Sequence, residues 1–134
     1  MKKCFTYLMA VLLVGLIFAS CKSNDNVDSN LLGKWSVTSI ETVEDGANIE
    51  IKMDGNNYMF FTFSSGGKYF QDVNAYEDKW DFNGTWALES NKLILDKGSM
   101  DEQVYTILEL TGNKLIMETK VGSQPTKYNL TKVN

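Results

Sequence analysis

The side chains on which most enzymes depend are scarce in this sequence. Its 134 residues include no histidine, and all 13 positively charged residues are lysine. Without histidine the chain can form no Ser-His or Cys-His nucleophile pair and no His-ligated zinc site. Without arginine it lacks the planar fork that binds phosphate or guanine, and its net charge of −4 repels a polyanion. We therefore expect no catalysis, no cofactor or metal, and no nucleic-acid partner.

The acidic residues could in principle supply acid–base catalysis or bind calcium. The adjacent pairs Asp101-Glu102 and Glu44-Asp45 lie in turn-like stretches, and neighbouring side chains of an extended chain point in opposite directions. The segment 72–78 has spacing like that of a calcium loop, but Glu77 stands where an EF-hand loop needs glycine. Asn83 stands where that loop needs a bidentate glutamate. These residues are therefore predicted to be solvated surface groups.

Cys21 is the residue near the N-terminus whose position suggests chemistry. Two lysines and an apolar run over 4–19 precede it, which is the pattern of a secretory signal. The residues before it, Phe18-Ala19-Ser20, resemble the lipobox of bacterial lipoproteins, in which the cysteine is acylated and begins the mature protein. An uncleaved membrane helix and a signal cut elsewhere are the alternatives, but the apolar run is short for a membrane span.

This interpretation divides the chain into three parts. Residues 1–20 are predicted to be a lipoprotein signal peptide, and 21–30 an acylated cysteine followed by a polar, flexible tether. Residues 31–134 are the folded domain. More than one acyl chain on Cys21 would hold the protein stably on a membrane. We expect a lipid-anchored protein of the cell envelope, in the outer membrane, on either its periplasmic or its outer face.

The folded domain shows a period of two residues and almost no helical period. This pattern predicts eight short strands, at 34–42, 58–63, 68–74, 80–88, 92–96, 103–110, 114–121 and 126–133. Short turns join them, apart from the stretches around 43–57 and 97–102. An open meander would leave two exposed edges, and 58–63 is apolar on both faces. We therefore predict an all-β fold, an eight-stranded antiparallel up-and-down β-barrel, with a two-sheet sandwich as the alternative.

Alternation predicts which side chains face the barrel interior. On the strand 80–88, Trp80, Phe82 and Trp86 share the apolar face. Gly84 lies on the same face, where a missing side chain indicates a bend or close packing by a neighbour. On the strand 103–110, Glu109 is expected to face outward. By alternation, the residues expected inside the barrel are Val104, Thr106, Leu108 and Leu110.

The predicted interior is either a packed core or the lining of a ligand cavity. An eight-stranded barrel is just wide enough to be filled by side chains or to hold one small ligand. Bulky residues dominate, which favours packing for any single position, and a pocket would open near the threonines. The candidate lining residues are Trp35, Thr62, Trp80, Phe82, Trp86, Thr106, Met117, Thr119 and Tyr128. A mixed aromatic and polar group at one barrel end gives the rim candidates Tyr76, Asp78, Asp81 and Asn83.

Several short motifs resemble those of one protein family. Residues 31–35 contain Gly-x-Trp, which resembles the lipocalin signature. Residues 61–69, 84–88 and 128–132 are similar to the short lipocalin-like lipoproteins of Bacteroides-type bacteria. The resemblance implies a calycin-type barrel closed at its bottom by Trp35, although no arginine exists to pack over this ring.

The resemblance also implies a function. It points to binding of a small hydrophobic or amphipathic ligand in the barrel or at its mouth. The alternative is a surface adaptor that contacts a protein or glycan through the barrel rim and has a packed core. A contiguous exposed aromatic patch near Tyr76 and Phe70 would favour the adaptor.

Overall fold

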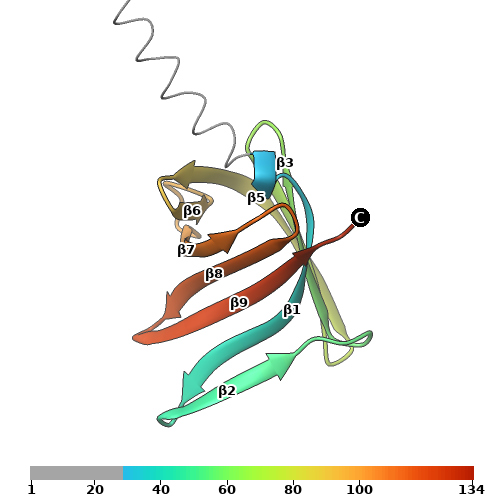
Figure 1. The fold of residues 1–134 in the computed structure, drawn as a ribbon, viewed down its shortest axis with the longest axis vertical. Coiled ribbons are helices and arrows are strands. Elements are labelled where there is room, and N and C mark those ends of the chain that lie inside the picture. Colours follow the sequence, from blue (N-terminus) through green and yellow to red (C-terminus); the bar gives the residue numbers. More distant parts are fainter. Residues whose placement is uncertain (1–28) are drawn as a thin grey trace, which may run out of the picture. The chain divides into compact units, whose positions relative to one another are not determined.

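Antiparallel strands make up most of the chain from Gly33 to Lys132 (Figure 1). The computed structural model describes residues 29–134, so the predicted signal peptide, Cys21 and most of the tether lie outside the described residues. Residues 29–31 form a helical turn, and no helix in the described range has the length and apolar content needed to cross a membrane. The strands are β1 (Gly33–Glu44), β2 (Ala47–Lys52), β3 (Tyr58–Ser64), β4 (Lys68–Ala75), β5 (Asp78–Glu89), β6 (Lys92–Leu95), β7 (Gln103–Leu110), β8 (Lys114–Val121) and β9 (Gln124–Lys132).

Eight of these strands close into the predicted barrel. Each of β3 to β9 pairs with its neighbour in sequence, and β1 pairs with β3 on one edge and with β9 on the other. The closing register places Trp35 opposite Lys132 and Val37 opposite Leu130. The first and last strands are therefore joined by backbone hydrogen bonds, and the predicted eight-stranded antiparallel barrel is confirmed.

The ninth strand, β2, was expected to be part of a connection. It pairs with residues 39–44 of β1, on the same edge that β3 occupies nearer the N-terminal end of the strand. The turn between β1 and β2 is Asp45-Gly46, and both residues have positive φ, 51° and 78°. Asp-Gly is a strong signal for a two-residue hairpin because both central residues of such a turn need positive φ. The signal was present in the sequence, but β2 was not among the eight predicted strands.

One end of the barrel is closed by a fully buried core. Trp35 has no exposed surface, and its indole Nε1 donates a hydrogen bond to the Leu31 carbonyl over 2.8 Å. The Lys132 ammonium lies 4.7 Å from the centre of the Trp35 indole. A lysine thus supplies the cation over this ring in a chain that has no arginine. The core around them contains the fully buried residues Leu31, Val37, Phe61, Phe63, Leu93, Leu95, Leu115, Met117 and Leu130.

The predicted inward face of β7 is wrong over most of the strand. Tyr105 is buried and Ile107 packs against the core, whereas Leu108 is 51% exposed. A β-bulge lies between Ile107 and Glu109 in the pairing of β7 with β8. A bulge inserts one residue and so reverses the faces of the strand beyond it. Leu110 therefore packs against the core as predicted, while the residues before the bulge face the opposite way.

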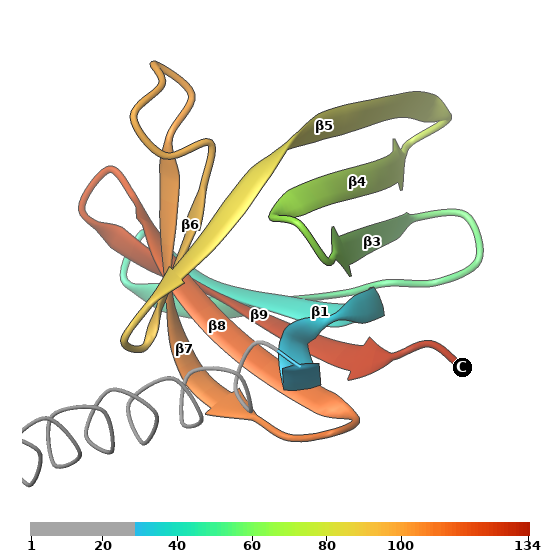
Figure 2. The same cartoon turned by 90° about the horizontal axis from the view of Figure 1, so that it is seen from above.

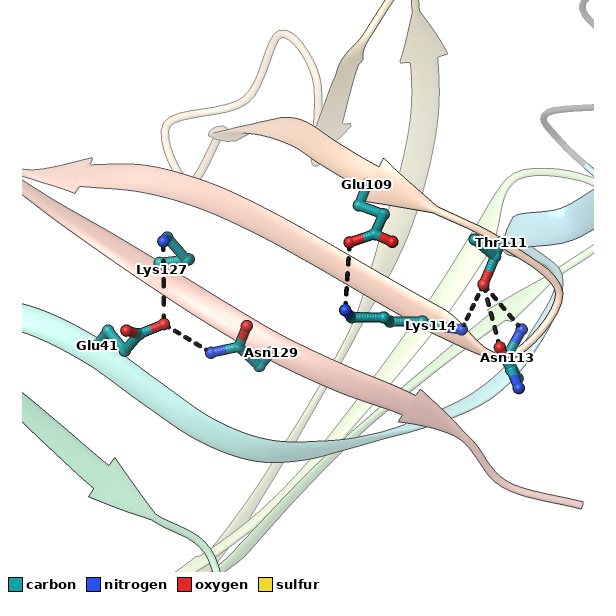
Figure 3. A network of polar contacts seen from close by, with 7 residues as sticks. All are labelled: Glu41, Glu109, Thr111, Asn113, Lys114, Lys127 and Asn129. Atoms are coloured by element: carbon teal, nitrogen blue, oxygen red, sulfur yellow. Dashed lines mark hydrogen bonds and ion pairs between the residues drawn. The ribbon is translucent and has the colours of Figure 1, made fainter.

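Polar side chains cover the outside of the β1–β9 pairing (Figure 3). The Asn129 amide donates hydrogen bonds to the Glu41 carboxylate, over 2.9 Å, and to the Ser39 hydroxyl, over 3.1 Å. Lys127 lies 3.9 Å from the same carboxylate. Exposed ion pairs contribute at most about 1 kcal/mol. This network therefore fixes the alignment of β1 with β9 more than it stabilises their pairing.

Candidate functional site

The barrel opens at the end opposite Trp35 because neighbouring strands differ in length. β5 has 12 residues and β6 has 4, and β6 pairs only with residues 86–89 of β5. Residues 78–85 of β5 therefore have a strand neighbour on one edge only, which is β4. The loop 96–102 meets β5 where β6 ends, because Asp96 N–H donates to the Thr85 carbonyl over 2.8 Å. Figure 2 shows β3–β5 flaring away from β6–β9 at this end.

A cavity of about 420 Å³ lies at this mouth. Its side chains come from β4, β5, the loop 96–102, β7 and β9. They combine aromatic rings, amides and two carboxylates, and none of them is cationic. The lining consists of Tyr69, Gln71, Phe82, Asn83, Asp96, Asp101, Gln103, Tyr105 and Tyr128. We call this set the mouth cavity.

Hydrogen bonds fix several of these groups. The Asp96 carboxylate accepts from the Thr85 backbone N–H over 3.0 Å and from the Tyr69 hydroxyl over 3.3 Å. The Tyr105 hydroxyl donates to Gln103 Oε1 over 2.9 Å. The Tyr105 and Tyr128 rings meet edge to face, with centres 5.7 Å apart. The mouth cavity is thus a set of positioned polar and aromatic groups, unlike the apolar core beneath it.

The three tyrosine hydroxyls of the mouth cavity are held in their neutral form. Burial raises the pKa of Tyr105 and the pKa of Tyr128 above the ordinary tyrosine value. Burial also raises the pKa of Tyr69, and the negative charges of Asp96 and Asp101 add to the effect. Removing the proton would place a phenolate in a poorly solvated site next to carboxylates. At neutral pH these hydroxyls therefore act as uncharged hydrogen-bonding groups.

Gly84 makes this arrangement possible. A Cβ atom at this position would lie 2.0 Å from Asp96 Oδ1 and 2.6 Å from Tyr69 Cε1. Those distances are far below van der Waals contact, so any side chain would push the carboxylate or the ring away from β5. The close approach that the sequence indicated at Gly84 is confirmed.

A second hollow lies in the barrel wall beside the mouth cavity. β7 pairs with β8 only from Thr106 onward, so residues 103–105 have no ladder partner in 119–121. One side-chain bond spans the split, from the Thr119 hydroxyl to the Val104 carbonyl over 2.9 Å. The hollow measures about 710 Å³ and shares three residues with the mouth cavity, Gln103, Tyr105 and Tyr128. Its other lining residues are Lys92, Glu102, Val104, Thr106, Glu118, Thr119, Lys120 and Val121.

The structure brings part of the predicted lining together. Phe82 and Tyr128 line the mouth cavity, as does Asn83 from the predicted rim. Thr119 lines the wall hollow. Trp80 is 42% exposed on β5, two residues before Phe82, and lies outside the cavity lining.

Other predicted lining residues lie elsewhere. Trp35 and Met117 have no exposed surface and belong to the closed end. Trp86 is partly buried against that core, and its indole Nε1 donates to the Ser64 carbonyl over 2.9 Å. None of these three side chains lines the mouth cavity.

The two remaining threonines do not face the interior. Thr62 lies between Phe61 and Phe63, whose side chains are buried inside, so alternation turns it outward. Thr106 faces away from the core because of the bulge in β7, although it borders the wall hollow. A hollow thus opens near Thr106 and Thr119, as expected, whereas Thr62 lines neither the wall hollow nor the mouth cavity.

The other rim candidates are exposed at the start of β5 or just before it. Tyr76, in the β4–β5 turn, is 86% exposed, and Asp78 and Asp81 are exposed on β5. None of the three lines the mouth cavity. Among the described residues, no group of three or more acidic or cysteine side chains is placed to hold a metal ion.

Sequence reasoning missed most of the mouth cavity. Tyr69 and Gln71 alternate with the buried Val73 on β4, so strand periodicity could have identified them. Tyr105 and Gln103 were missed because the bulge in β7 reverses the expected faces. Asp96 and Asp101 lie on a loop, and nothing in the residue pattern indicates that this loop reaches the cavity.

Comparison with known proteins gives the family. The sequence-family model of the lipocalin-like domain matches residues 31–117. A solved structure of a lipocalin-like protein from Bacteroides uniformis aligns with a TM-score of 0.55 and 14% sequence identity, over 78% of this chain and 99% of that one. A search of curated proteins found no significant match. With a matching family model over most of its length and the same barrel fold, this chain belongs to the lipocalin-like domain family.

Proposed function

We propose that the protein binds a small amphipathic molecule at the open mouth of its barrel. The observation that carries this proposal is the mouth cavity, about 420 Å³ in size, with the Phe82 ring 49% exposed on the inward face of β5. Ligand sites of proteins are typically concave, aromatic-lined and roughly 300–1,000 Å³ in volume, with a few convergent polar groups. The mouth cavity has each of these properties.

The packed core limits how deeply the ligand enters. From Trp35 and Leu115 at the closed end to Tyr105 near the mouth, side chains of the core are buried against one another. The ligand therefore rests on Phe82 and the tyrosines, with its remaining length directed to solvent or to the wall hollow. A shallow site of this kind suits a short or partly exposed amphiphile better than a long chain enclosed in the barrel.

We further propose that the protein acts by binding and not by catalysis. The chain has no histidine, and the Asp96 carboxylate is engaged by Thr85 and Tyr69. The Tyr69 hydroxyl that meets this carboxylate has a raised pKa, which disfavours its use as a nucleophile. The groups present can recognise a ligand through hydrogen bonds and aromatic contacts.

The proposed location is the surface of the outer membrane. There the acyl chains on Cys21 anchor the domain. The support is the sequence around Cys21, which lies outside the described residues. Cys21→Ser is expected to abolish metabolic labelling with a fatty acid, while Cys4→Ser leaves labelling of the mature protein intact. Full labelling of the Cys21 variant would contradict the anchor.

The binding proposal is tested with a neutral amphiphile. Hexanol is titrated into the envelope-expressed protein in lipid nanodiscs, with tyrosine rings labelled for NMR and empty nanodiscs correcting for partitioning. We expect saturable shifts of the Tyr69, Tyr105 and Tyr128 rings, and about tenfold weaker binding by Phe82→Ala. The matched control is Phe70→Ala, an exposed aromatic that does not line the mouth cavity. Shifts that never saturate would contradict the proposal.

A second candidate is a surface adaptor that binds a glycan or a protein through its rim. The favouring observation is the exposure of Tyr76 and Trp80 beside the carboxylates of Asp78 and Asp81. Exposed aromatic rings next to carboxylates can stack on and hydrogen-bond a sugar. Capture of a glycan that is lost in Tyr76→Ala but kept in Phe82→Ala would favour this candidate over the mouth cavity.

A further inference from the structure

The lining of the mouth cavity is acidic. It includes two carboxylates, Asp96 and Asp101, and neither lysine nor any other cation. The adjoining wall hollow differs, since its lysines Lys92 and Lys120 offset the carboxylates of two glutamates. A concave site lined by charge of one sign concentrates counter-ions of the other sign. The mouth cavity therefore favours a positive group and repels a negative one.

Both carboxylates act on the same point inside the cavity. Asp96 accepts the hydrogen bond of the Tyr69 hydroxyl, and the negative charges of Asp96 and Asp101 both oppose ionisation of that hydroxyl. The loop that carries Asp101 is itself ordered, because Asp101 N–H donates to the Ser99 hydroxyl and Gly98 N–H to the Glu102 carboxylate. The negative field is thus directed into the cavity by a defined loop.

Aromatic rings complete the site. Four of the nine lining residues are aromatic, namely Phe82, Tyr69, Tyr105 and Tyr128. The faces of such rings attract ammonium groups, more strongly when the site is desolvated. Rings and carboxylates together recognise a cation that also carries apolar surface. A fatty acid, whose carboxylate would meet Asp96 and Asp101, is the amphiphile that the same lining disfavours.

We propose that the ligand of the mouth cavity is an amphiphile with a cationic head group, an alkylamine or a quaternary ammonium compound. This inference rests on the proposed binding function and specifies its ligand class. The ammonium group lies among the tyrosine rings near Asp96 and Asp101, and the apolar part contacts Phe82.

The test compares three amphiphiles that carry a cationic, a neutral or an anionic head group on an alkyl chain of similar length. Hexyltrimethylammonium, hexanol and hexanoate are titrated by NMR into the envelope-expressed protein in nanodiscs of uncharged lipid. We expect the cation to bind at least tenfold more tightly than hexanoate, with hexanol between them. Equal affinities, or preference for hexanoate, would overturn the inference alone. Saturable binding by none of the three would overturn the proposed function and the inference with it.

Variants locate the source of the selectivity. Asp101→Asn and Asp96→Asn are each expected to reduce the ratio of cation to anion affinity about threefold. Asp101 is exposed, so its variant keeps the test valid if Asp96→Asn does not fold. The matched control is Asp45→Asn, which removes an exposed carboxylate from the β1–β2 turn, outside the mouth cavity. An equal loss of selectivity in this control would overturn the assignment to the mouth cavity.

Discussion

The two ends of the barrel are built from the same alternation of residues, yet they differ in burial. Trp35, Leu115 and Leu130 at the closed end are fully buried, whereas Trp80 and Phe82 at the mouth are each more than two-fifths exposed. At the closed end Trp35, Leu115 and Leu130 each have strand neighbours on both sides. At the mouth β5 continues past the end of β6, so its inward face meets a loop and solvent. Alternation therefore predicts which way a side chain points, and the lengths of neighbouring strands decide whether it is buried.

The largest difference between the ends is expected on removing a tryptophan. Trp35→Ala removes a fully buried indole and its bond to Leu31, so the free energy of unfolding falls by about 4 kcal/mol. Trp80→Ala removes a half-exposed ring and costs about 1 kcal/mol. Urea denaturation measures both values. Similar losses would show that the mouth is as tightly packed as the closed end.

A smaller loss is expected where the mouth meets β5. Gly84→Ala places a methyl group within 2.0 Å of Asp96 Oδ1, so we expect the free energy of unfolding to fall by about 2 kcal/mol. The control, Gly55→Ala, has open space around the new methyl group. If Gly84→Ala were as stable as the control, Asp96 would not be held against β5 as described.

Alkaline pH should act mainly on the mouth, because its tyrosines have raised pKa values. A tyrosine with a higher pKa in the folded state than in the unfolded state leaves stability unaffected below about pH 10. Above it, stability falls by about 1.4 kcal/mol per pH unit for each such tyrosine, until the pH passes the folded-state pKa. Tyr105→Phe should lessen this fall between pH 10 and 11, measured by urea denaturation. An unchanged slope would contradict the burial of this hydroxyl.

The smallest effect concerns the cation over Trp35. Lys132→Gln removes the contact between the ammonium and the indole, and we expect a loss of about 1 kcal/mol in the free energy of unfolding. Lys132→Arg should retain most of that stability, because guanidinium also stacks on an indole. Lys34→Gln, which removes a similar contact with Phe60 on the outer face, should cost less. Equal losses in Lys132→Gln and Lys132→Arg would contradict a role for the charge.

The fold was predictable to the extent that it follows from local patterns. Two-residue periodicity predicted all eight barrel strands. The segment 58–63, which is apolar on both faces and corresponds to β3, predicted a closed sheet. β2 was missed because its two signals, the Asp-Gly turn and the alternation of Ile49 and Ile51 with polar residues, extend over only a few positions. The faces of β7 were misassigned because a bulge depends on pairing with β8, which a single strand's sequence does not reveal.

The mouth cavity was less predictable for a physical reason. Phe82 and Tyr128 could be selected by their position on a strand, and both line the cavity. Trp35, Trp86 and Met117 satisfied the same criterion and are core, because the sequence does not show which end of the barrel is closed. Asp96 and Asp101 reach the site through a loop whose path depends on the short length of β6.

One edge of β1 pairs with two strands, β3 and β2, and this division affects which part of the domain can unfold locally. The barrel is closed by the pairing of β1 with β3 and β9, whereas β2 pairs only with the C-terminal half of β1. Amide protons of β1 that bond to β9 should exchange with deuterium only when the whole domain unfolds. The hydrogen bonds between β2 and β1 can break and re-form without disturbing the pairing of β1 with β9. The amide protons of β2 should therefore exchange first. Such fraying would change the shape of one side of the barrel entrance while the molecule remains folded.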